Sequence, residues 1–160
     1  CTVIATASPE KLEQLKELGA DYAVDHRKED WYKEVFKISK DLAKTKDDVP
    51  GIDVIFEHIG GSHFNKELTL LKYGATMVTT GATTGYDVPA DLRHIFFKGI
   101  NILGSTQGTR AELEDGFYWM GQGKIKVIID SVYSFENAVD AHKRMLNGKG
   151  LVGKIILKPE

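Results

Sequence analysis

The chain has little of several residue types, and each shortage excludes a class of protein. Only one of its 160 residues is a cysteine, Cys1, which excludes an internal disulfide framework and a cysteine-rich zinc site. Four prolines and 16 glycines exclude a collagen-like or proline-rich disordered chain. No apolar run approaches the roughly 20 residues that a membrane-spanning helix needs, so we expect no membrane partner.

The charges of the chain nearly cancel, since 21 basic residues face 23 acidic ones and leave a formal net charge of −2. A chain whose charges nearly cancel has no excess of positive charge to attract a nucleic acid, so we expect no nucleic-acid partner. Hydrophobic residues make up 42% of the chain, which is enough for a sizeable core. With its single cysteine, this composition is typical of a reducing compartment and predicts a cytoplasmic protein.

The first residues, CTVIATAS, already form an apolar run of the kind found in strands. No charged leader with a small-residue cleavage site precedes this run, as a signal peptide would require. The sequence reads as if entered in mid-fold, and we expect it to be a fragment of a longer protein.

Strand patterns and helix patterns alternate along the chain. The helix patterns carry apolar residues three or four positions apart. Such alternation predicts an α/β fold with a mostly parallel sheet and right-handed crossovers. The clearest strand, residues 52–56, is nearly all apolar, which predicts a strand buried on both faces. The expected strands cover residues 2–6, 22–24, 52–56, 75–80, 100–104, 126–130 and 154–157.

The segments that follow the first five strands deserve most weight, because ligands of open α/β sheets bind beyond the carboxyl ends of the strands. These segments read TASPEK, DHRKED, EHIGG, TGATTG and STQGT. Four of them are rich in glycine, serine or threonine, which permit close backbone approach and offer hydroxyl groups. They indicate either a site for a polar, phosphate-bearing ligand or ordinary connections between strands and helices.

Five segments taken in order resemble landmarks of the medium-chain dehydrogenase/reductase superfamily, in its zinc-binding alcohol dehydrogenase and quinone oxidoreductase branch. They are ASPEKLEQLKELGADYAVDHRKED, GIDVIFEHIGG, GATTG with LRHIFF, ILGSTQGT and GLVGKIILKP. The resemblance implies a Rossmann-like doubly wound parallel sheet that lacks its first strand and glycine-rich turn, since Gly19 is the first glycine. It implies a partial NAD(P)-binding domain over residues 1–107. Residues 108–160 would then form a linking helix and return to the catalytic domain.

The resemblance also implies a function. The chain would be the cofactor-binding C-terminal portion of an NAD(P)-dependent oxidoreductase, which transfers hydride between nicotinamide and an alcohol/carbonyl or quinone/enone substrate. Any zinc ligands would lie upstream, so zinc in the missing catalytic domain stays open, and the 160-residue piece alone is not expected to catalyse. The alternative is a non-catalytic dinucleotide-binding or structural protein on the same fold. The family also implies a homodimer or a larger even oligomer, through the edge strand Asn101–Ser105.

The loop after the first strand bears on the choice of cofactor. NAD-dependent enzymes of this fold normally carry an acid there that binds the adenosine ribose, whereas this chain reads Thr6-Ala7-Ser8-Pro9. We therefore expect Ser8 and Lys11 to bind a 2′-phosphate, with Arg27 completing the pocket. The sequence favours NADP(H) over NAD(H). The alternative is that Ser8 only caps a helix and Lys11 is a solvated surface lysine.

The resemblance assigns the remaining cofactor contacts by position, mostly to backbone groups. We predict no catalytic residue and no metal ligand in this chain, since its five histidines lack the spacing of a metal motif. The expected contacts are His58, Ile59 and Gly60 for the ribose, Gly81, Ala82 and Thr83 near the nicotinamide, and Ser105 and Thr106 near the carboxamide.

Overall fold

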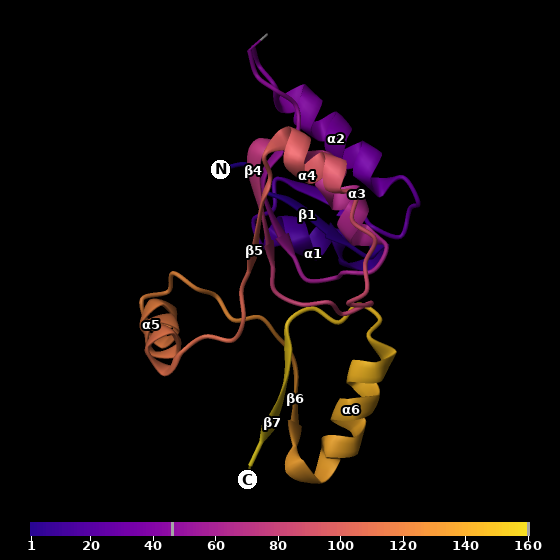
Figure 1. The fold of residues 1–160 in the computed structure, drawn as a ribbon. Helices are drawn as coiled ribbons and strands as arrows, with labels where there is room; N and C mark the ends of the chain where they lie inside the picture. Colours follow the sequence, from indigo (N-terminus) through magenta and orange to yellow (C-terminus); the bar gives the residue numbers. More distant parts are fainter. Residues whose placement is uncertain (46, 160) are drawn as a thin grey trace. The chain divides into compact units, whose positions relative to one another are not determined.

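The structure, a computed structural model, describes residues 1–45 and 47–159 (Figure 1). Within these residues seven strands form three sheets, and every strand pair is parallel. The predicted α/β fold with parallel sheets is confirmed. The chain divides into two units, one made of residues 28–107 and the other of residues 1–27 together with 108–160.

The unit of residues 28–107 contains a three-stranded sheet in the order β3-β4-β5. Helix α3 packs on β3 and β4 and contacts both α2 and α4, and the three helices lie together in Figure 1. The elements are α2 (Trp31–Leu42), β3 (Ile52–Glu57), α3 (His63–Leu70), β4 (Leu71–Thr79), α4 (Leu92–Lys98) and β5 (Asn101–Gly104).

A compact hydrophobic core holds this unit together. Phe64 and Leu68 stand four residues apart on α3 and so share the helix face that meets the sheet. Leu68 and Met77 are fully buried, and each such burial stabilises the fold by about 1.5–3 kcal/mol. The buried cluster consists of Leu68, Leu71, Ala75, Met77 and Ile100, with Ile55, Phe64 and Ile95 partly buried against it.

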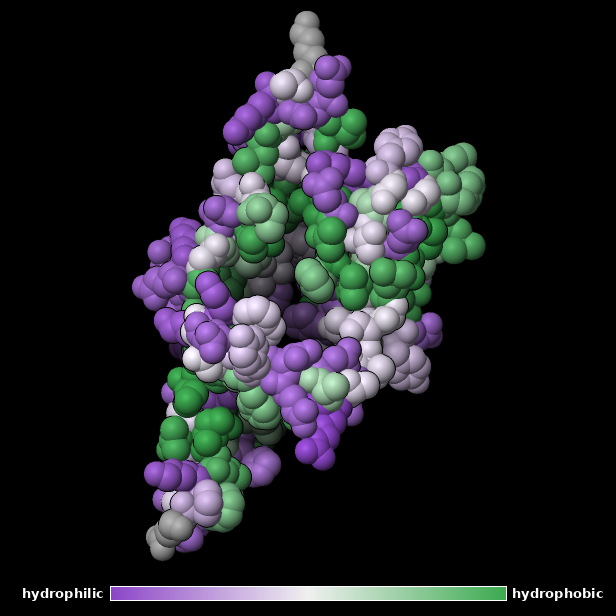
Figure 2. Space-filling view, turned by 90° about the vertical axis from the view of Figure 1, so that its left-hand side faces the viewer, coloured by the Kyte–Doolittle hydropathy of each residue, from purple (hydrophilic) through white to green (hydrophobic). Residues whose placement is uncertain are grey.

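Strand β3 is covered on one face only. Glu57 is 2% exposed, whereas Val54 and Phe56 are 51% and 78% exposed. Within the unit of residues 28–107, helix α3 covers one face of β3 and no described element covers the other, so the prediction of a strand buried on both faces is wrong for this unit. Figure 2 shows hydrophobic residues that reach the surface in several groups between hydrophilic ones.

Strand β4 begins earlier than its pattern suggested. We expected Tyr73-Gly74 to be a turn before a strand starting at Ala75, but β4 starts at Leu71. Ile52 pairs with Leu71 and Val54 with Thr76, so the register shifts between these pairs. Gly74, with φ of 71°, lies in the longer side of this shift. The turn signal thus produces a bulge inside a strand.

The unit made of residues 1–27 and 108–160 contains two β-α-β arrangements, and a separate helix, α5. In each arrangement the helix contacts both parallel strands, α1 with β1 and β2, and α6 with β6 and β7. Strand β6 was expected at residues 126–130 and instead pairs with β7 over residues 129–134. The elements are β1 (Ile4–Ala7), η1 (Pro9–Lys11), α1 (Leu12–Glu17), β2 (Tyr22–Asp25), α5 (Arg110–Gly121), β6 (Ile129–Ser134), η2 (Phe135–Asn137), α6 (Ala138–Asn147) and β7 (Lys154–Lys158).

Helix α5 begins at Arg110, directly after the N-cap residue Thr109. Thr109 and Glu112 form a capping box, in which each residue's side chain accepts a hydrogen bond from the other's backbone N–H. None of the helices in the described residues is long and apolar enough to cross a membrane.

Candidate functional site

The predicted cofactor residues fall into two groups, one in each unit. Ser8, Lys11 and Arg27 follow strands β1 and β2, and the other eight follow β3, β4 and β5. Because all strand pairs are parallel, the loops within each group leave the same edge of their sheet.

The first group is brought together by the pairing of β1 with β2. Ala7 lies opposite Asp25, and the N–H of His26 donates to the carbonyl of Ala7 at 3.1 Å. Ser8 is buried and occupies the N-cap position of η1, where its carbonyl accepts from the N–H of Lys11 at 3.0 Å. Its hydroxyl makes no capping hydrogen bond. Ser8 therefore caps η1 through its backbone, and a role in binding phosphate stays a prediction.

Arg27 already holds a carboxylate in this structure. Its guanidinium donates to both Glu10 oxygens, from Nη1 at 3.2 Å and from Nη2 at 2.9 Å. The pKa of Glu10 is lowered, first by its own backbone N–H and then by Arg27 and Ser8. Sequence reasoning missed this pair, although Glu10 is the only acid in the loop that follows β1.

The second group is organised around a buried acid that sequence reasoning also missed. Glu57 ends β3, and its carboxylate accepts hydrogen bonds from the N–H groups of Ile59 at 2.6 Å and Gly60 at 2.5 Å. The Thr79 hydroxyl donates to its second oxygen at 3.1 Å. One acid thus fixes the turn after β3 and ties it to the end of β4. The available signal was an acid at the end of an apolar strand, directly before the turn to Gly60.

The loops after β3 and β4 are joined by paired hydrogen bonds. Thr83 donates its backbone N–H at 3.2 Å and its hydroxyl at 2.9 Å to the carbonyl of His58. Thr84 does the same to the carbonyl of Ile59, at 2.8 Å and 2.9 Å. Because each carbonyl accepts twice, the two loops form a single rigid ledge, which we call the β3–β4 ledge (residues 58–61 and 80–85).

Gly60 is required by the backbone of this ledge. Its φ of 68° is unfavourable for residues with a side chain, and an added Cβ would lie 2.3 Å from the carbonyl oxygen of Gly85. The N–H of the next residue, Gly61, donates to that same oxygen at 3.0 Å. The close approach of the two loops therefore depends on glycine at this position.

The structure brings all eight predicted residues of the second group to one sheet edge. The N–H of Ser105 donates to the carbonyl of Thr79 at 2.9 Å, which extends the pairing of β4 with β5 to the edge where the ledge begins. Most of these residues are small and exposed, and the backbone of their loops is held by hydrogen bonds of Glu57, Thr83 and Thr84. The exposed members are His58, Gly81, Ala82, Thr83, Ser105 and Thr106, whereas Ile59 is partly buried and Gly60 is buried.

A second buried acid, Glu67, lies on helix α3. Burial, and after it repulsion from Glu57, together raise the pKa of Glu67 to about 7. Its Oε2 atom is buried and has no hydrogen-bond partner among the described residues. Strongly perturbed acids of this kind cluster at functional sites, although structural networks produce them too.

The described residues do not fit a zinc site. Zinc in proteins takes its ligands from cysteine, histidine and acidic side chains. Among residues 1–45 and 47–159, no three such side chains gather where they could hold a metal ion.

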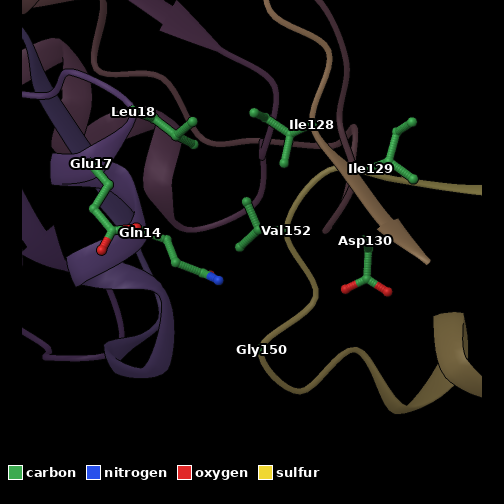
Figure 3. Close-up of a pocket in the computed structure, with 8 residues that line it drawn as sticks. All are labelled: Gln14, Glu17, Leu18, Ile128, Ile129, Asp130, Gly150 and Val152. Atoms are coloured by element: carbon green, nitrogen blue, oxygen red, sulfur yellow. The ribbon is translucent and has the colours of Figure 1, made fainter.

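A hollow of about 300 Å³ lies in the unit of residues 1–27 and 108–160 (Figure 3). Asp130, which lines the hollow, forms an ion pair with the guanidinium of Arg144. Because none of the predicted cofactor residues lines it, we assign no function to this hollow. The lining residues are Gln14, Glu17, Leu18, Ile128, Ile129, Asp130, Gly150 and Val152.

Comparison with known proteins gives consistent relatives. The quinone oxidoreductase of Pongo abelii is 29% identical over 97% of this chain and 46% of its own length. The alcohol dehydrogenase of Geobacillus stearothermophilus is 29% identical over 93% of this chain and 41% of its own length. The crystal structure of an NAD-dependent alcohol dehydrogenase matches with a TM-score of 0.82 and 30% identity, over 98% of this chain and 43% of that one. The chain thus spans less than half the length of these relatives.

Two more distant structures share the fold and contain nicotinamide cofactors. The crotonyl-CoA carboxylase/reductase AntE, solved with NADP, matches with a TM-score of 0.80 and 20% identity over 98% of this chain and 43% of that one. A dehydrogenase from E. coli CFT073, solved with NADH, matches with a TM-score of 0.80 and 21% identity over 96% of this chain and 43% of that one.

The pattern of one family, described as zinc-binding dehydrogenase, matches residues 1–122, which is most of the chain. The order of strands and helices and the relatives agree with this match. The chain therefore belongs to the zinc-binding dehydrogenase family of the medium-chain dehydrogenase/reductase superfamily, and corresponds to the C-terminal part of its members.

Proposed function

We propose that this chain is the cofactor-binding portion of an NAD(P)-dependent oxidoreductase. The complete protein would transfer hydride between nicotinamide and an alcohol/carbonyl or quinone/enone substrate. The observation that carries the proposal is the β3–β4 ledge, whose exposed residues stand on a backbone locked by Glu57, Thr83 and Thr84. In this proposal residues 1–107 bind the dinucleotide, and residues 108–160 link to the catalytic domain and complete it.

The residues of the ledge would orient the cofactor. His58, Ile59 and Gly60 would support the ribose, residues 81–83 would lie near the nicotinamide, and Ser105 and Thr106 near its carboxamide. The nicotinamide supplies or accepts the hydride, and the protein contributes position and electrostatics. A ledge that is rigid before the cofactor arrives lowers the entropy lost on binding.

We further propose that NADP(H) is preferred to NAD(H). Lys11 would provide the principal positive charge for the 2′-phosphate, and the hydroxyl of Ser8 a donor. Arg27 would contribute less than its sequence position suggested, because two of its five N–H donors point to Glu10. The phosphate would share this guanidinium with the carboxylate.

The test is a titration of the complete protein with NADPH and with NADH. We expect NADPH to bind more tightly. Lys11→Gln should raise the dissociation constant for NADPH by about fivefold to tenfold, equivalent to about 1–1.4 kcal/mol, and leave that for NADH unchanged. Lys16→Gln is the matched control, because Lys16 is an exposed lysine of α1 that pairs with Glu13. Equal affinities in the wild type would refute the NADP(H) preference, and failure to bind either cofactor would refute the proposed function.

The complete protein is proposed to be a cytoplasmic homodimer or larger even oligomer. All four residues of β5 are exposed, and within the described residues β5 pairs only with β4, which leaves its outer edge open. An open apolar edge favours pairing with a second copy. Sedimentation equilibrium should give an even multiple of the monomer mass, and Leu103→Lys on this edge should lower that mass. A strict monomer in the wild type would contradict the proposal.

A further inference from the structure

Two buried acids, Glu57 at the end of β3 and Glu67 on helix α3, are not used by the proposed cofactor contacts. Glu57 and Glu67 are 2% and 9% exposed, which is rare for carboxyl groups without a basic partner. Glu57 is bonded to the turn above it, through the N–H groups of Ile59 and Gly60. Glu67 comes from helix α3, which packs on strands β3 and β4.

Several basic groups on the elements around α3 have partners other than Glu67. The causes of the raised Glu67 pKa are its burial and the charge of Glu57. His63, one turn earlier on α3, stacks against the Trp31 ring of α2. On α4, Lys98 donates to the carbonyls of Leu68, Thr69 and Leu71, and Arg93 pairs with Asp91. On β4, Lys72 pairs with Asp53. Lys28 pairs with Glu34 of α2, Lys40 of α2 lies above the Phe36 ring, and Lys66 of α3 donates to the carbonyl of Glu29.

We propose that Glu57 is a positioning residue for the dinucleotide, and that the proton carried by Glu67 controls how firmly Glu57 holds the ledge. The inference rests on the proposed function, because the ledge is the surface assigned to the ribose and nicotinamide. Glu57 acts through backbone groups and touches no cofactor atom. Hydrogen bonds to a charged acceptor are roughly twice as strong as neutral ones, so a carboxylate fixes the turn better than an amide does.

Glu67 changes its charge in the neutral range, since its pKa is raised to about 7. Below that pH it is protonated and adds no negative charge beside Glu57. Above that pH it is ionised, and two carboxylates repel each other in a buried site where water screens them poorly. The repulsion disfavours Glu57 at the position from which it binds Ile59 and Gly60, and the ledge loosens.

Cofactor affinity should therefore depend on pH. A dinucleotide that needs the fixed ledge binds best when Glu67 is protonated. By linkage, binding of the dinucleotide must favour protonation of Glu67 to the same extent, so the protein takes up protons on binding near pH 7.

The experiment measures the dissociation constant of the complete protein for NADPH at pH 6 and pH 8. The wild type should bind about tenfold less tightly at pH 8, which corresponds to about 1.4 kcal/mol. Glu67→Gln should bind with the same affinity at both values, close to that of the wild type at pH 6. Because the 2′-phosphate of NADPH also titrates, the decisive quantity is the difference between the wild type and Glu67→Gln.

Two further variants separate positioning from general damage. Glu57→Gln should bind NADPH about tenfold more weakly at pH 6 and show a smaller change between pH 6 and pH 8, because the repelling charge is gone. Asp53→Asn should behave as the wild type, since Asp53 is an exposed acid of the same strand paired with Lys72. If Glu57→Gln does not fold, Glu67→Gln alone still decides the proposal.

The outcomes distinguish this inference from the proposed function. If the wild type and Glu67→Gln show the same pH dependence, the inference is overturned while the proposed function stands. If the protein binds no dinucleotide, amide hydrogen exchange of Ile59 and Gly60 without ligand still tests the carboxylate pair. Their protection should be lower at pH 8 than at pH 6, after correction for intrinsic exchange, in the wild type and not in Glu67→Gln. Equal corrected protection at both values in the wild type would overturn the inference.

Discussion

The two groups of loops at the sheet edges are built by different means. After β1 and β2, polar and charged side chains carry the chemistry, and Glu10 and Arg27 form an ion pair in which the arginine side chain is 60% exposed. After β3 and β4, a buried acid and backbone carbonyls carry it, and Glu57 is 2% exposed. Exposed ion pairs contribute little to stability, whereas buried hydrogen bonds to charged groups contribute more.

This contrast gives the two groups of loops different tasks in the proposed function. The loops after β1 and β2 can change the ligand they prefer at little cost in stability, because their charged groups are held weakly. The β3–β4 ledge cannot change without disturbing the core, because the buried Glu57 bonds both to the turn of the ledge and to Thr79 of β4. We therefore expect substitutions in the first group to alter cofactor preference, and those in the second to alter stability and affinity for every cofactor.

The largest effect is expected for Gly60→Ala, which tests whether the ledge needs the close approach of its two loops. The added Cβ would lie 2.3 Å from the Gly85 oxygen, and the φ of 68° adds strain. We expect a loss of about 3 kcal/mol in the free energy of unfolding, measured by denaturant titration.

Gly99→Ala is the matched control for that change. Gly99 has a similar φ of 60°, but its added Cβ would meet nothing within 4 Å. It should cost only the backbone strain, about 1 kcal/mol. Equal losses in the two variants would mean that the contact with Gly85 contributes nothing.

The second effect concerns the pH dependence of stability. The Glu67 pKa is raised from 4.5 to about 7 in the folded protein. Its protonated form therefore contributes stability that is fully present below pH 4.5 and is lost as pH rises through 7. Relative to Glu67→Gln, the wild type should lose about 3 kcal/mol between these limits, measured by urea unfolding at a series of pH values. Parallel curves for the two proteins would show that Glu67 does not titrate in this range.

A smaller effect is expected for Thr79→Val, which removes the hydroxyl that donates to Glu57 at 3.1 Å. The variant should lose about 1.5–3 kcal/mol, because a buried charge would lack one of its donors. Thr79→Ser keeps the hydroxyl and should restore most of this loss. A serine variant as unstable as the valine variant would point to packing of the methyl group instead.

The smallest effect on stability belongs to Glu10→Gln, in the loops after β1 and β2. Loss of an exposed ion pair should change the free energy of unfolding by less than about 0.5 kcal/mol. Because Arg27 is released, the ratio of NADPH to NADH affinity should rise severalfold in a binding titration. An unchanged ratio would show that Arg27 does not reach the 2′-phosphate.

Local patterns were sufficient to predict most of the fold. Apolar spacing predicted that helices alternate with strands, and apolar runs predicted β3 and β5, because these signals depend on residues close in the sequence. The start of β4 at Leu71 was not predicted, because a glycine such as Gly74 is equally typical of a turn and of a bulge within a strand. The open face of β3 was missed because an apolar side chain does not reveal whether another element covers it.

The candidate site was predicted in part for a similar reason. Loop positions such as Gly60 and Thr83 follow from where strands end. The partner of a charged side chain depends on sheet register, and neither the pair of Glu10 with Arg27 nor the bonds of Glu57 could be deduced from spacing. Helix α3 brings Glu67 close enough to Glu57 for their charges to interact, and this proximity exists only in the folded arrangement.

The most direct test of this account is amide hydrogen exchange of the complete protein with and without NADPH. The account predicts that bound NADPH slows exchange in residues 58–60 and 81–83, with little change on the exposed face of α5. Unchanged exchange in both segments, at an NADPH concentration that saturates binding, would contradict the assignment of the β3–β4 ledge to the cofactor.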